Sequence, residues 1–452
     1  MNDEDCKQVW RDVGNKFKDC GQYTHAERAW RMVLEMSPDD FGAMNEIGIL
    51  YERREMHDEA LLWYAKAVRA TGDKGAVELS NMGLQLWWKR DFETALLATE
   101  RSIASDPNLS CAWSVYAMVL LDLQRVDEAL SATERAVQLD PKALNLLWNR
   151  SLQHLMLGHY EQGWLDFEYR YHPDNGCRNT FPPEISIPMW QGEDLAGKKL
   201  LVCKEQGFGD QMQCLRWLPH LLDTGADVTV WVAPALEGVV ASVVPVRVVT
   251  TPEPPDEPFD YMVMLYSLPL RFGANEFTIP SGPYIHADTF KAGIARALVN
   301  DFARGRPKVG INYFGAPGPV NDLYRSAKIR DMLPLLDNLD VAWVSLHNSA
   351  PDSHPNMLYL GDTLKSFADT AAVIDNLDLV ISVDSGNAHL AAAMGKPVWL
   401  LLAFNNDYRW LLHRKDTPWY PTMLLFRQQE MGYWEPVVER VSQSLQEWIS
   451  AA

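Results

Sequence analysis

The sequence is poor in cysteine and in positive charge, and it contains no long hydrophobic run. Six of its 452 residues are cysteine, and no two of them form a C-x-x-C pair, so we expect reduced thiols and no zinc site. No stretch approaches the roughly 18 consecutive apolar residues of a membrane-spanning helix. The N-terminal MNDEDCKQVW also lacks the apolar core of a secretory signal. We therefore expect a cytoplasmic protein with no membrane span and no bound metal.

The acidic charge balance of the chain argues against polyanions as its binding partners. Lysine and arginine number 41 against 60 aspartate and glutamate, which gives a net charge of −19, and both residues 1–171 and residues 172–452 are net acidic. Such a protein repels phosphate, which argues against nucleic acid or an anionic membrane as its partner. At about three times the typical domain length, the chain is expected to form two or three domains.

Small residues recur at a nearly constant interval along the first third of the chain. The recurring positions are Gly14, Gly48, Gly83 and Ala117, and after each of them Ala26, Ala60, Ala95 and Ala129. Small side chains let two antiparallel helices approach closely, and Pro38, Pro107 and Pro141 are placed to end the second helix of a pair. With a period of about 34 residues, the pattern over residues 1–171 resembles a tetratricopeptide-repeat (TPR) array. The resemblance implies an α-solenoid whose concave surface holds a peptide or a partner protein.

The remainder of the chain alternates strand and helix patterns. Residues 172–197 lack helical periodicity and read as a linker. Buried strands are expected at residues 199–203, 227–232, 246–250, 260–266, 308–314, 341–348, 379–385 and 397–403. Strands that alternate with helices predict parallel, doubly wound sheets with the ligand at the carboxyl ends of the strands. The predicted parts are an N-terminal Rossmann-like lobe (198–287), an inter-lobe linker (288–305), a C-terminal Rossmann-like lobe (306–433) and a final helix (434–452).

One strand-to-helix turn has the features of an anion site. The run Val383-Asp384-Ser385-Gly386 ends a predicted strand at a carboxylate and opens a helix, whose free N–H groups and dipole attract a phosphate. An ordinary packed helix with Ser385 as its N-cap fits the same residues. A serine-hydrolase elbow does not, because G-x-S-x-G requires glycine where Val383 stands.

The surrounding sequence resembles a known enzyme family. The run ISVDSGNAHLAAAMGKPVWLLL (381–402), with NNDYRWLLHRKDTPWYP after it, is similar to the donor-binding half of the heptosyltransferase-like glycosyltransferases of family 9, over about residues 190–450. The resemblance implies the two-lobed GT-B fold and metal-independent transfer of a sugar from a nucleotide donor. It also implies that the donor's sugar and phosphate are faced by Asp384, Ser385, Gly386 and Asn387, with His389 close behind.

The turn Glu205-Gln206-Gly207-Phe208-Gly209-Asp210 is the second candidate site. It fails as a dinucleotide fingerprint, because Met212 stands where the third glycine of G-x-G-x-x-G belongs. Gly207 and Gly209 still predict a tight, open loop. The turn resembles the family's G-D pair before a helix that ends in L-P, which implies that Asp210 is the base that deprotonates the acceptor. A helix N-cap is the alternative role for Asp210, and Glu205 is the reserve candidate for the base.

Two further groups complete the expected site. Arg325 follows the glycine- and proline-rich loop 315–319, where a guanidinium could clamp the leaving phosphate; Lys328 could replace it, and a solvated surface pair is the alternative. Ser345 and His347 close the next strand, where the resemblance implies contacts to the donor's base and ribose. The aromatic and basic residues of the tail either line the cleft or pack the last elements onto the first lobe; they are Arg409, Trp410, Trp419, Tyr420 and Arg427.

These observations predict a glycosyltransferase that moves a sugar from a nucleotide donor to a protein held by the repeats. Single displacement by Asp210 predicts inversion, and the nucleotide sugar is a substrate, with CMP-linked sugars among the candidates, so no cofactor is expected. Repeat-fused transferases that modify flagellin make flagellin a candidate acceptor. The alternatives are a catalytically inactive repeat scaffold and a heptosyl-type transferase of cell-surface glycans. The sugar, the acceptor and the oligomeric state are not readable from the sequence.

Overall fold

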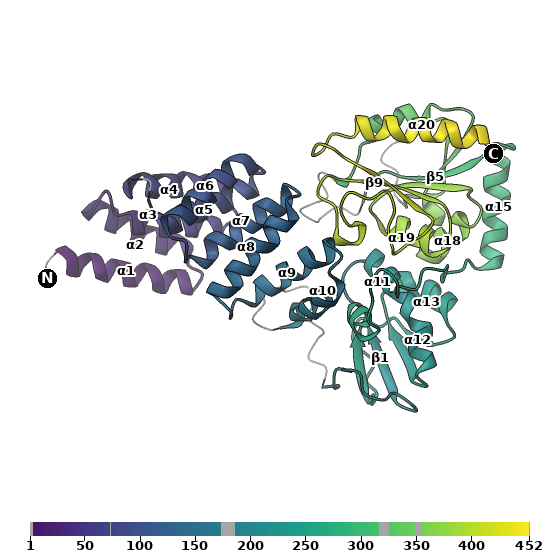
Figure 1. Cartoon of the computed structure of the whole chain (residues 1–452), viewed down its shortest axis with the longest axis horizontal. Coiled ribbons are helices and arrows are strands. Elements are labelled where there is room, and N and C mark those ends of the chain that lie inside the picture. The colour runs from purple at the N-terminus through teal and green to yellow at the C-terminus, as the bar shows by residue number, and fades with distance from the viewer. Residues whose placement is uncertain (1–2, 73, 173–185, 316–324, 349–353, 452) are drawn as a thin grey trace. The chain divides into compact units, whose positions relative to one another are not determined.

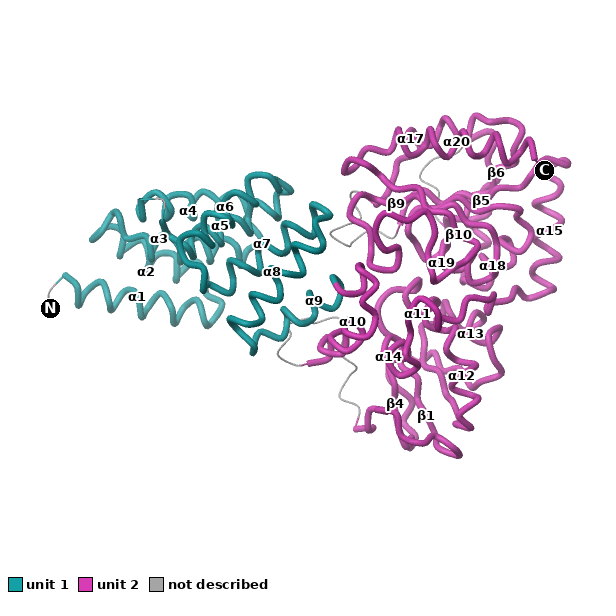
Figure 2. Tube along the Cα trace, viewed as in Figure 1, with its two compact units in different colours: residues 1–153 teal, residues 154–452 magenta. Residues whose placement is uncertain are grey.

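The computed structural model describes residues 3–72, 74–172, 186–315, 325–348 and 354–451. The chain divides into two compact units, residues 1–153 and residues 154–452 (Figure 2). Residues 173–185, which are half of the expected linker, and the predicted loop 315–319, apart from Gly315, lie outside the described residues.

The first unit consists of helices that pack in antiparallel pairs (Figure 1). They are α1 (Asp3–Asp19), α2 (Tyr23–Met36), α3 (Phe41–Glu52), α4 (His57–Ala70), α5 (Ala76–Trp88), α6 (Phe92–Ser105), α7 (Ser110–Asp122), α8 (Val126–Leu139) and α9 (Leu144–Met156), the last of which continues into the second unit. The most extensive helix contacts lie within the pairs α1/α2, α3/α4, α5/α6 and α7/α8. This arrangement confirms the expected repeat array.

The recurring small residues allow the two helices of a pair to touch. A methyl group added at Gly48 of α3 would lie 2.6 Å from Cε1 of Tyr64 in α4. The same addition at Gly14 of α1 would lie 2.7 Å from Nε1 of Trp30 in α2. Both distances are far below van der Waals contact, so the large ring of one helix occupies the space left by the glycine of the other.

The second unit opens with α10 (Tyr160–Phe167) and the 3₁₀ helix η1 (Glu168–Tyr171). Trp164 of α10 donates from Nε1 to the carbonyl of Ala274 at 3.1 Å, and its ring is buried. These elements therefore fold onto the α/β region, and the division between the units falls earlier than the expected boundary after residue 171.

The first lobe contains a parallel sheet in the order β3-β2-β1-β4. Its strands are β1 (Lys199–Cys203), β2 (Asp227–Trp231), β3 (Arg247–Val249) and β4 (Tyr261–Met264). Its helices are α11 (Phe208–Cys214), η3 (Leu215–Trp217), α12 (Leu218–Asp223), η4 (Pro234–Leu236), α13 (Glu237–Val243), η5 (Leu265–Ser267) and α14 (Leu268–Arg271). All four predicted strands of this lobe are present; β1 has the predicted bounds, and the other three are shorter than predicted.

The second lobe contains a parallel sheet in the order β10-β9-β8-β5-β6-β7. Its strands are β5 (Lys308–Asn312), β6 (Ala342–Ser345), β7 (Met357–Tyr359), β8 (Leu379–Val383), β9 (Val398–Leu402) and β10 (Met423–Arg427). Its helices are α15 (Thr289–Ala303), α17 (Ile329–Leu336), η6 (Gly361–Thr363), α18 (Phe367–Ile374), α19 (Gly386–Ala393), η7 (Tyr408–Trp410) and α20 (Glu435–Ala451). The expectation of four strands is corrected here: β7 is too short to show a strand pattern, and β10 lies in the tail, where no strand was expected.

The strand order of each sheet determines where a ligand can bind. The chain reverses its direction of winding between β1 and β4 in the first sheet and between β5 and β8 in the second. In open parallel sheets the ligand crevice lies at such a reversal, outside the carboxyl ends of the strands. The turns after β1, β4, β5 and β8 are therefore the places to look for a site. Within the described ranges, no helix is both long and apolar enough to cross a membrane.

Candidate active site

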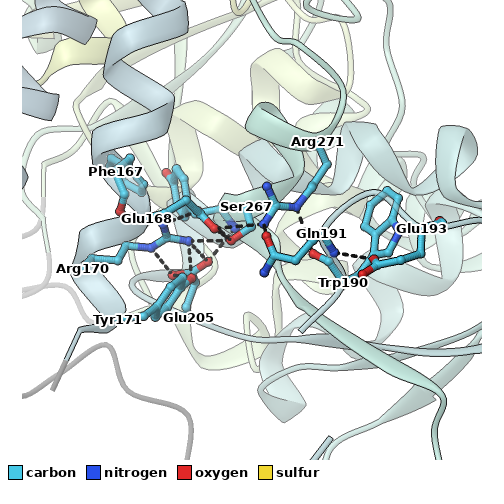
Figure 3. Close-up of polar contacts among 11 residues, drawn as sticks. Phe167, Glu168, Arg170, Tyr171, Trp190, Gln191, Glu193, Glu205, Ser267 and Arg271 are labelled. Atoms are coloured by element: carbon cyan, nitrogen blue, oxygen red, sulfur yellow. Dashed lines mark hydrogen bonds and ion pairs between the residues drawn. The ribbon is translucent and has the colours of Figure 1, made fainter. Parts of the chain in front are cut away.

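Glu205, in the turn after β1, is a buried anchor rather than an open carboxylate (Figure 3). Arg170 of η1 donates two hydrogen bonds to this carboxylate, from Nε to Oε2 at 3.0 Å and from Nη2 to Oε1 at 3.1 Å. The Tyr171 hydroxyl donates to Oε2 at 2.7 Å, and the backbone N–H of Tyr266 donates to Oε1 at 2.6 Å. The Glu205 side chain is 1% exposed, whereas that of Asp210 is 24% exposed, which makes Glu205 the poorer candidate for the base.

Asp210 lies in the first turn of α11 and faces the second lobe. Its Oδ2 accepts from the N–H of Gly207 at 2.8 Å, as a helix-capping carboxylate does. Its Oδ1 accepts from the Tyr266 hydroxyl at 3.1 Å and forms an ion pair with Nη2 of Arg409. Arg409 belongs to η7 of the second lobe, so this ion pair joins the two lobes. Asp210 therefore caps α11, the role expected as the alternative, and also contacts the second lobe through Arg409.

Gly209 brings the two lobes into direct contact. A methyl group at this position would lie 2.7 Å from Cδ2 of His389 and 3.4 Å from the Cα of Gly386. Only glycine lets the start of α11 approach the start of α19 this closely. The glycine of the first predicted turn thus places Asp210 beside the second predicted turn.

The N-terminus of α19 is held by side chains from neighbouring strands. Ser385 is the N-cap, and its Oγ accepts from the N–H of Ala388 and from Nδ2 of Asn312 at 3.0 Å. Asn387 donates to Oδ1 of Asn312 at 3.0 Å and to the carbonyl of Leu346 at 2.9 Å. Because Asn312 ends β5 and Ser385 follows β8, these bonds close the reversal point of the second sheet. The side chains of Ser385 and Asn387 shape the helix start, which leaves backbone N–H groups as the means of holding a phosphate.

Asp384 is the carboxylate at the end of β8. Burial, with a smaller contribution from the nearby Asp407 carboxylate, raises the pKa of Asp384 to about 6, although Arg409 and Arg325 act in the opposite direction. Its Oδ2 accepts from Nε1 of Trp410 at 2.8 Å. The side chain is therefore fixed in position, with a pKa above its ordinary value of 3.8.

His389 lies one turn into α19 and is buried. Its Nδ1 is 2.9 Å from the Tyr420 hydroxyl, and its Nε2 is 3.8 Å from Oδ1 of Asp384. Burial lowers the pKa of His389 well below its usual value, so the ring is neutral at physiological pH. The neutral ring thus lies beside Asp384, and its expected place behind residues that face the donor stays a prediction.

A second buried histidine, His347, lies just after the carboxyl end of β6. His347 accepts at Nε2 from the N–H of Tyr313 at 3.2 Å and stacks on Phe314 at 3.6 Å between ring centroids. Burial lowers the pKa of His347 to about 3. Ser345 is fully buried, and its Oγ accepts from the N–H of His347. Both residues are engaged inside the lobe, so the contacts to base and ribose expected of them stay a prediction.

The two expected phosphate clamps differ in their placement. Arg325 is close enough to Asp384 to oppose the rise in that group's pKa, and its guanidinium covers Gly315, where a methyl group would lie 2.5 Å from Nη2. Lys328 begins α17 at an exposed position, where its N–H donates to Asp331. The geometry favours Arg325 over Lys328.

The tail residues pack the lobes together. Trp410, Trp419 and Tyr420 are buried, and Arg409 is buried between them and the first lobe. Burial lowers the pKa of Arg427 to about 10, and its guanidinium binds the carbonyls of Arg414 and Trp410. The two roles expected for this tail are thus divided among its residues: Arg427 packs within the second lobe, whereas Arg409 contacts Asp210 and Trp410 contacts Asp384.

Sequence reasoning missed two residues of the site, Tyr266 and Asn312. Each lies at the carboxyl end of a predicted strand, in LY after β4 and in IN at the end of β5. A polar group at that end of a parallel strand is the signal that could have identified them. Among the described residues, no group of three His, Cys, Asp or Glu side chains is arranged to hold a metal ion.

Comparisons with known proteins agree with this division of the chain. A tetratricopeptide-repeat model matches residues 15–74, and the model of glycosyltransferase family 9 (heptosyltransferase) matches residues 358–412. Protein FlbA of Caulobacter vibrioides is 25% identical over 458 residues, which cover 92% of this chain and 74% of FlbA. The tetratricopeptide repeat-containing protein trd-1 of Caenorhabditis elegans is 22% identical over 209 residues, which cover 45% of this chain and 26% of trd-1. A solved structure of Pseudomonas aeruginosa pilF covers 50% of this chain and 89% of its own at 14% identity, with a TM-score of 0.37.

The matched segment 358–412 contains Asp384, the start of α19 and Arg409, which are the second-lobe half of the site described above. Together with the repeats, it defines a glycosyltransferase with a TPR region. The chain is a fusion of tetratricopeptide repeats with a glycosyltransferase family 9 domain.

Proposed function

We propose that the protein transfers a sugar from a nucleotide donor to a protein acceptor, with inversion at the anomeric carbon and without a metal ion. The observation that carries the proposal is the contact of α11 with α19. Gly209 packs on Gly386 and His389, so Asp210 lies opposite the helix start that belongs to the family 9 segment. The two lobes, read as a GT-B pair, then enclose the reaction between them.

On the acceptor side, Asp210 is the proposed base. It takes the proton of the acceptor hydroxyl while the oxygen attacks the anomeric carbon, and the bond from that carbon to the donor phosphate breaks. Gly207, Tyr266 and Arg409 all donate to its carboxylate, which fixes the orientation of the carboxylate toward the second lobe. Arg409 must turn away from Asp210 before the carboxylate can accept a proton.

On the donor side, the N-terminus of α19 and Arg325 are proposed to hold the phosphates. The helix N–H groups and the guanidinium neutralise the charge that grows on the leaving phosphate. Asp384 then contacts the sugar, and Ser345 and His347 border the nucleoside. Gly386, Asn387 and Ser385 act mainly by shaping the helix start.

The repeats are proposed to recruit the acceptor, because a small acceptor needs no solenoid of packed helix pairs. Flagellin and a CMP-linked sugar are one candidate pair of acceptor and donor. We place the reaction in the cytoplasm, where nucleotide sugars are available.

A donor screen tests this proposal. The full chain is incubated with UDP-, GDP-, ADP- and CMP-linked sugars, and release of the nucleotide is measured. We expect turnover of one donor class, loss of turnover in Asp384→Ala, and retention in Asp301→Asn, an exposed aspartate of α15. No turnover of any donor, with Asp384→Ala behaving like wild type in donor-induced thermal shift, would favour the inactive repeat scaffold instead.

A further inference from the structure

The residues that hold Asp210 in place begin outside the first lobe, in η1 directly after α10. We infer that Arg170 and Tyr266 are positioning residues for the candidate base, and that a chain of hydrogen bonds through Glu205 joins the end of the repeat-like helices to the reacting carboxylate. The inference rests on the proposed function and deepens it, because it names what sets the base in its place.

The chain starts at a buried ion pair. The side chains of Arg170 and Glu205 are 0% and 1% exposed. Arg170 reaches Glu205 through two nitrogens and also donates to the Ser267 hydroxyl at 3.2 Å and to the carbonyl of Phe167 at 2.9 Å. Figure 3 shows this guanidinium beside Glu205, with Tyr171 against the same carboxylate. A forked contact of this kind fixes the orientation of both planar groups.

Glu205, held in this orientation, in turn binds Tyr266. Its Oε1 accepts from the backbone N–H of Tyr266 at 2.6 Å, which holds the start of η5 where β4 ends. The ring of Tyr266 also packs against Phe167 of α10, with 5.5 Å between ring centroids. The ring of Tyr266 thus contacts the segment that carries Arg170 directly, and its backbone is linked to Arg170 through Glu205.

Tyr266 in turn touches the candidate base. Its hydroxyl is 3.1 Å from Oδ1 of Asp210 and 3.2 Å from Oε1 of Gln213. Burial raises the pKa of Tyr266 well above its usual value, so the hydroxyl keeps its proton and acts as a donor. Arg409 donates to the same hydroxyl and to Asp210 from the second lobe. Once Arg409 has turned away from Asp210, as the proposed reaction requires, Tyr266 is the side chain that still holds Oδ1 in position.

The test compares kcat with the donor KM in single variants. Tyr266→Phe removes only the hydroxyl, and we expect kcat for the accepted nucleotide sugar to fall by about tenfold with the KM unchanged, since one hydrogen bond to a charged group is lost. Arg170→Lys keeps the charge and loses the fork, and a fall in kcat alone is again expected. Tyr171→Phe removes one hydrogen bond to Glu205 and serves where Arg170→Lys does not fold.

The matched control is Arg271→Gln. Arg271 belongs to the same polar cluster and contacts Glu168, Gln191 and the carbonyl of Trp190, and neither Glu205 nor Tyr266 is among its hydrogen-bond partners in the described part of the chain (Figure 3). We expect its kcat to stay within about twofold of wild type, because it lies off the chain to Asp210.

A double-mutant cycle separates positioning from a general structural effect. Asp210→Glu keeps a carboxylate but moves it by one methylene, so activity stays measurable and the contact with Tyr266 is already lost. Tyr266→Phe is then expected to lower kcat no further in the Asp210→Glu background. Equal losses in both backgrounds, or a wild-type kcat in Tyr266→Phe, overturn the inference while the proposed function stands. Absence of turnover in wild type, or a wild-type rate in Asp210→Asn, overturns the proposed function and the inference with it.

Discussion

Two ion pairs, one in each unit, join elements that are about equally far apart in sequence, yet they differ in their surroundings. Lys18 of α1 binds Glu46 of α3 at 2.6 Å, and the two side chains are 24% and 23% exposed. Arg170 binds Glu205 with both side chains almost fully buried. Water screens the first pair and not the second, so the same chemistry has different energetic weight in the two units.

The comparison shows where each unit obtains its stability. The repeats are held by close packing of glycine and alanine against large rings, as at Gly48 and Tyr64, and their charges lie near solvent. The α/β unit places charged groups away from water around the points where its strand order reverses: Arg170, Glu205 and Arg409 are buried, and the Asp384 side chain is 18% exposed. Burying charge costs free energy, and a fold bears that cost where it serves binding or catalysis.

The largest effect is expected from breaking the buried pair. Arg170→Met leaves the Glu205 carboxylate buried without its counter-ion, which should lower the free energy of unfolding of the α/β unit by about 3 to 5 kcal/mol. Hydrogen exchange in peptides that contain β1 and β4 measures this loss, while peptides from α3 to α6 should keep their wild-type protection.

The control for this variant is the double replacement Arg170→Met with Glu205→Leu. It removes both charges, so we expect it to recover a large part of the lost stability. Equal protection of β1 in wild type and in Arg170→Met would show that the pair contributes no more than a surface one, and the contrast between the units would disappear.

A smaller effect is expected from Asp384, and it depends on pH. The pKa of about 6 in the folded protein lies above the ordinary value of 3.8, because burial disfavours the charged form. Protonation of Asp384 therefore stabilises the folded state relative to the unfolded state. This contribution is complete below about pH 4 and is lost as the pH rises through 6. At pH 7.5, Asp384→Asn should be more stable than wild type by about 2 kcal/mol, although it loses transferase activity.

Unfolding in urea at pH 7.5 and at pH 4 measures this difference, with Asp301→Asn as the exposed control. The gain of Asp384→Asn should shrink toward zero at pH 4. A gain of the same size at both pH values would mean that the carboxylate is not the cause.

The third effect probes packing in the repeats. Gly48→Ala places a methyl group 2.6 Å from the ring of Tyr64, which is fully buried and bonded through its hydroxyl to Glu52 at 2.7 Å. Overpacking should cost about 1 to 2 kcal/mol after the gain in helix propensity is counted. Hydrogen exchange in α3 and α4 measures it. Gly42→Ala, in the same helix with no contact closer than 3.4 Å, should be neutral or slightly stabilising; a loss as large in that control would contradict the packing argument.

The contrast between the units also explains what the sequence could predict. The repeat spacing and the apolar runs of β1, β5 and β8 depend on neighbours in sequence, so they were readable as patterns. The turns at Asp210 and Asp384 were readable for the same reason. The ion pair of Asp210 with Arg409 spans 199 positions, and the bond of Glu205 to Tyr266 spans 61. The first contact forms only when the two lobes pack, and the second only when β1 and β4 pair within the first lobe, so no local pattern encodes either of them.

The smallest effect is expected from the exposed pair in the repeats. Lys18→Met removes the partner of Glu46, which stays close to water, so the free energy of unfolding should change by less than about 1 kcal/mol. The difference in free energy of unfolding between wild type and Lys18→Met should vanish in 0.5 M salt, because mobile ions screen a pair near solvent. Urea unfolding of wild type and Lys18→Met in low and high salt measures both statements. A loss of several kcal/mol that persists in high salt would mean that burial is not what separates this pair from Arg170 and Glu205.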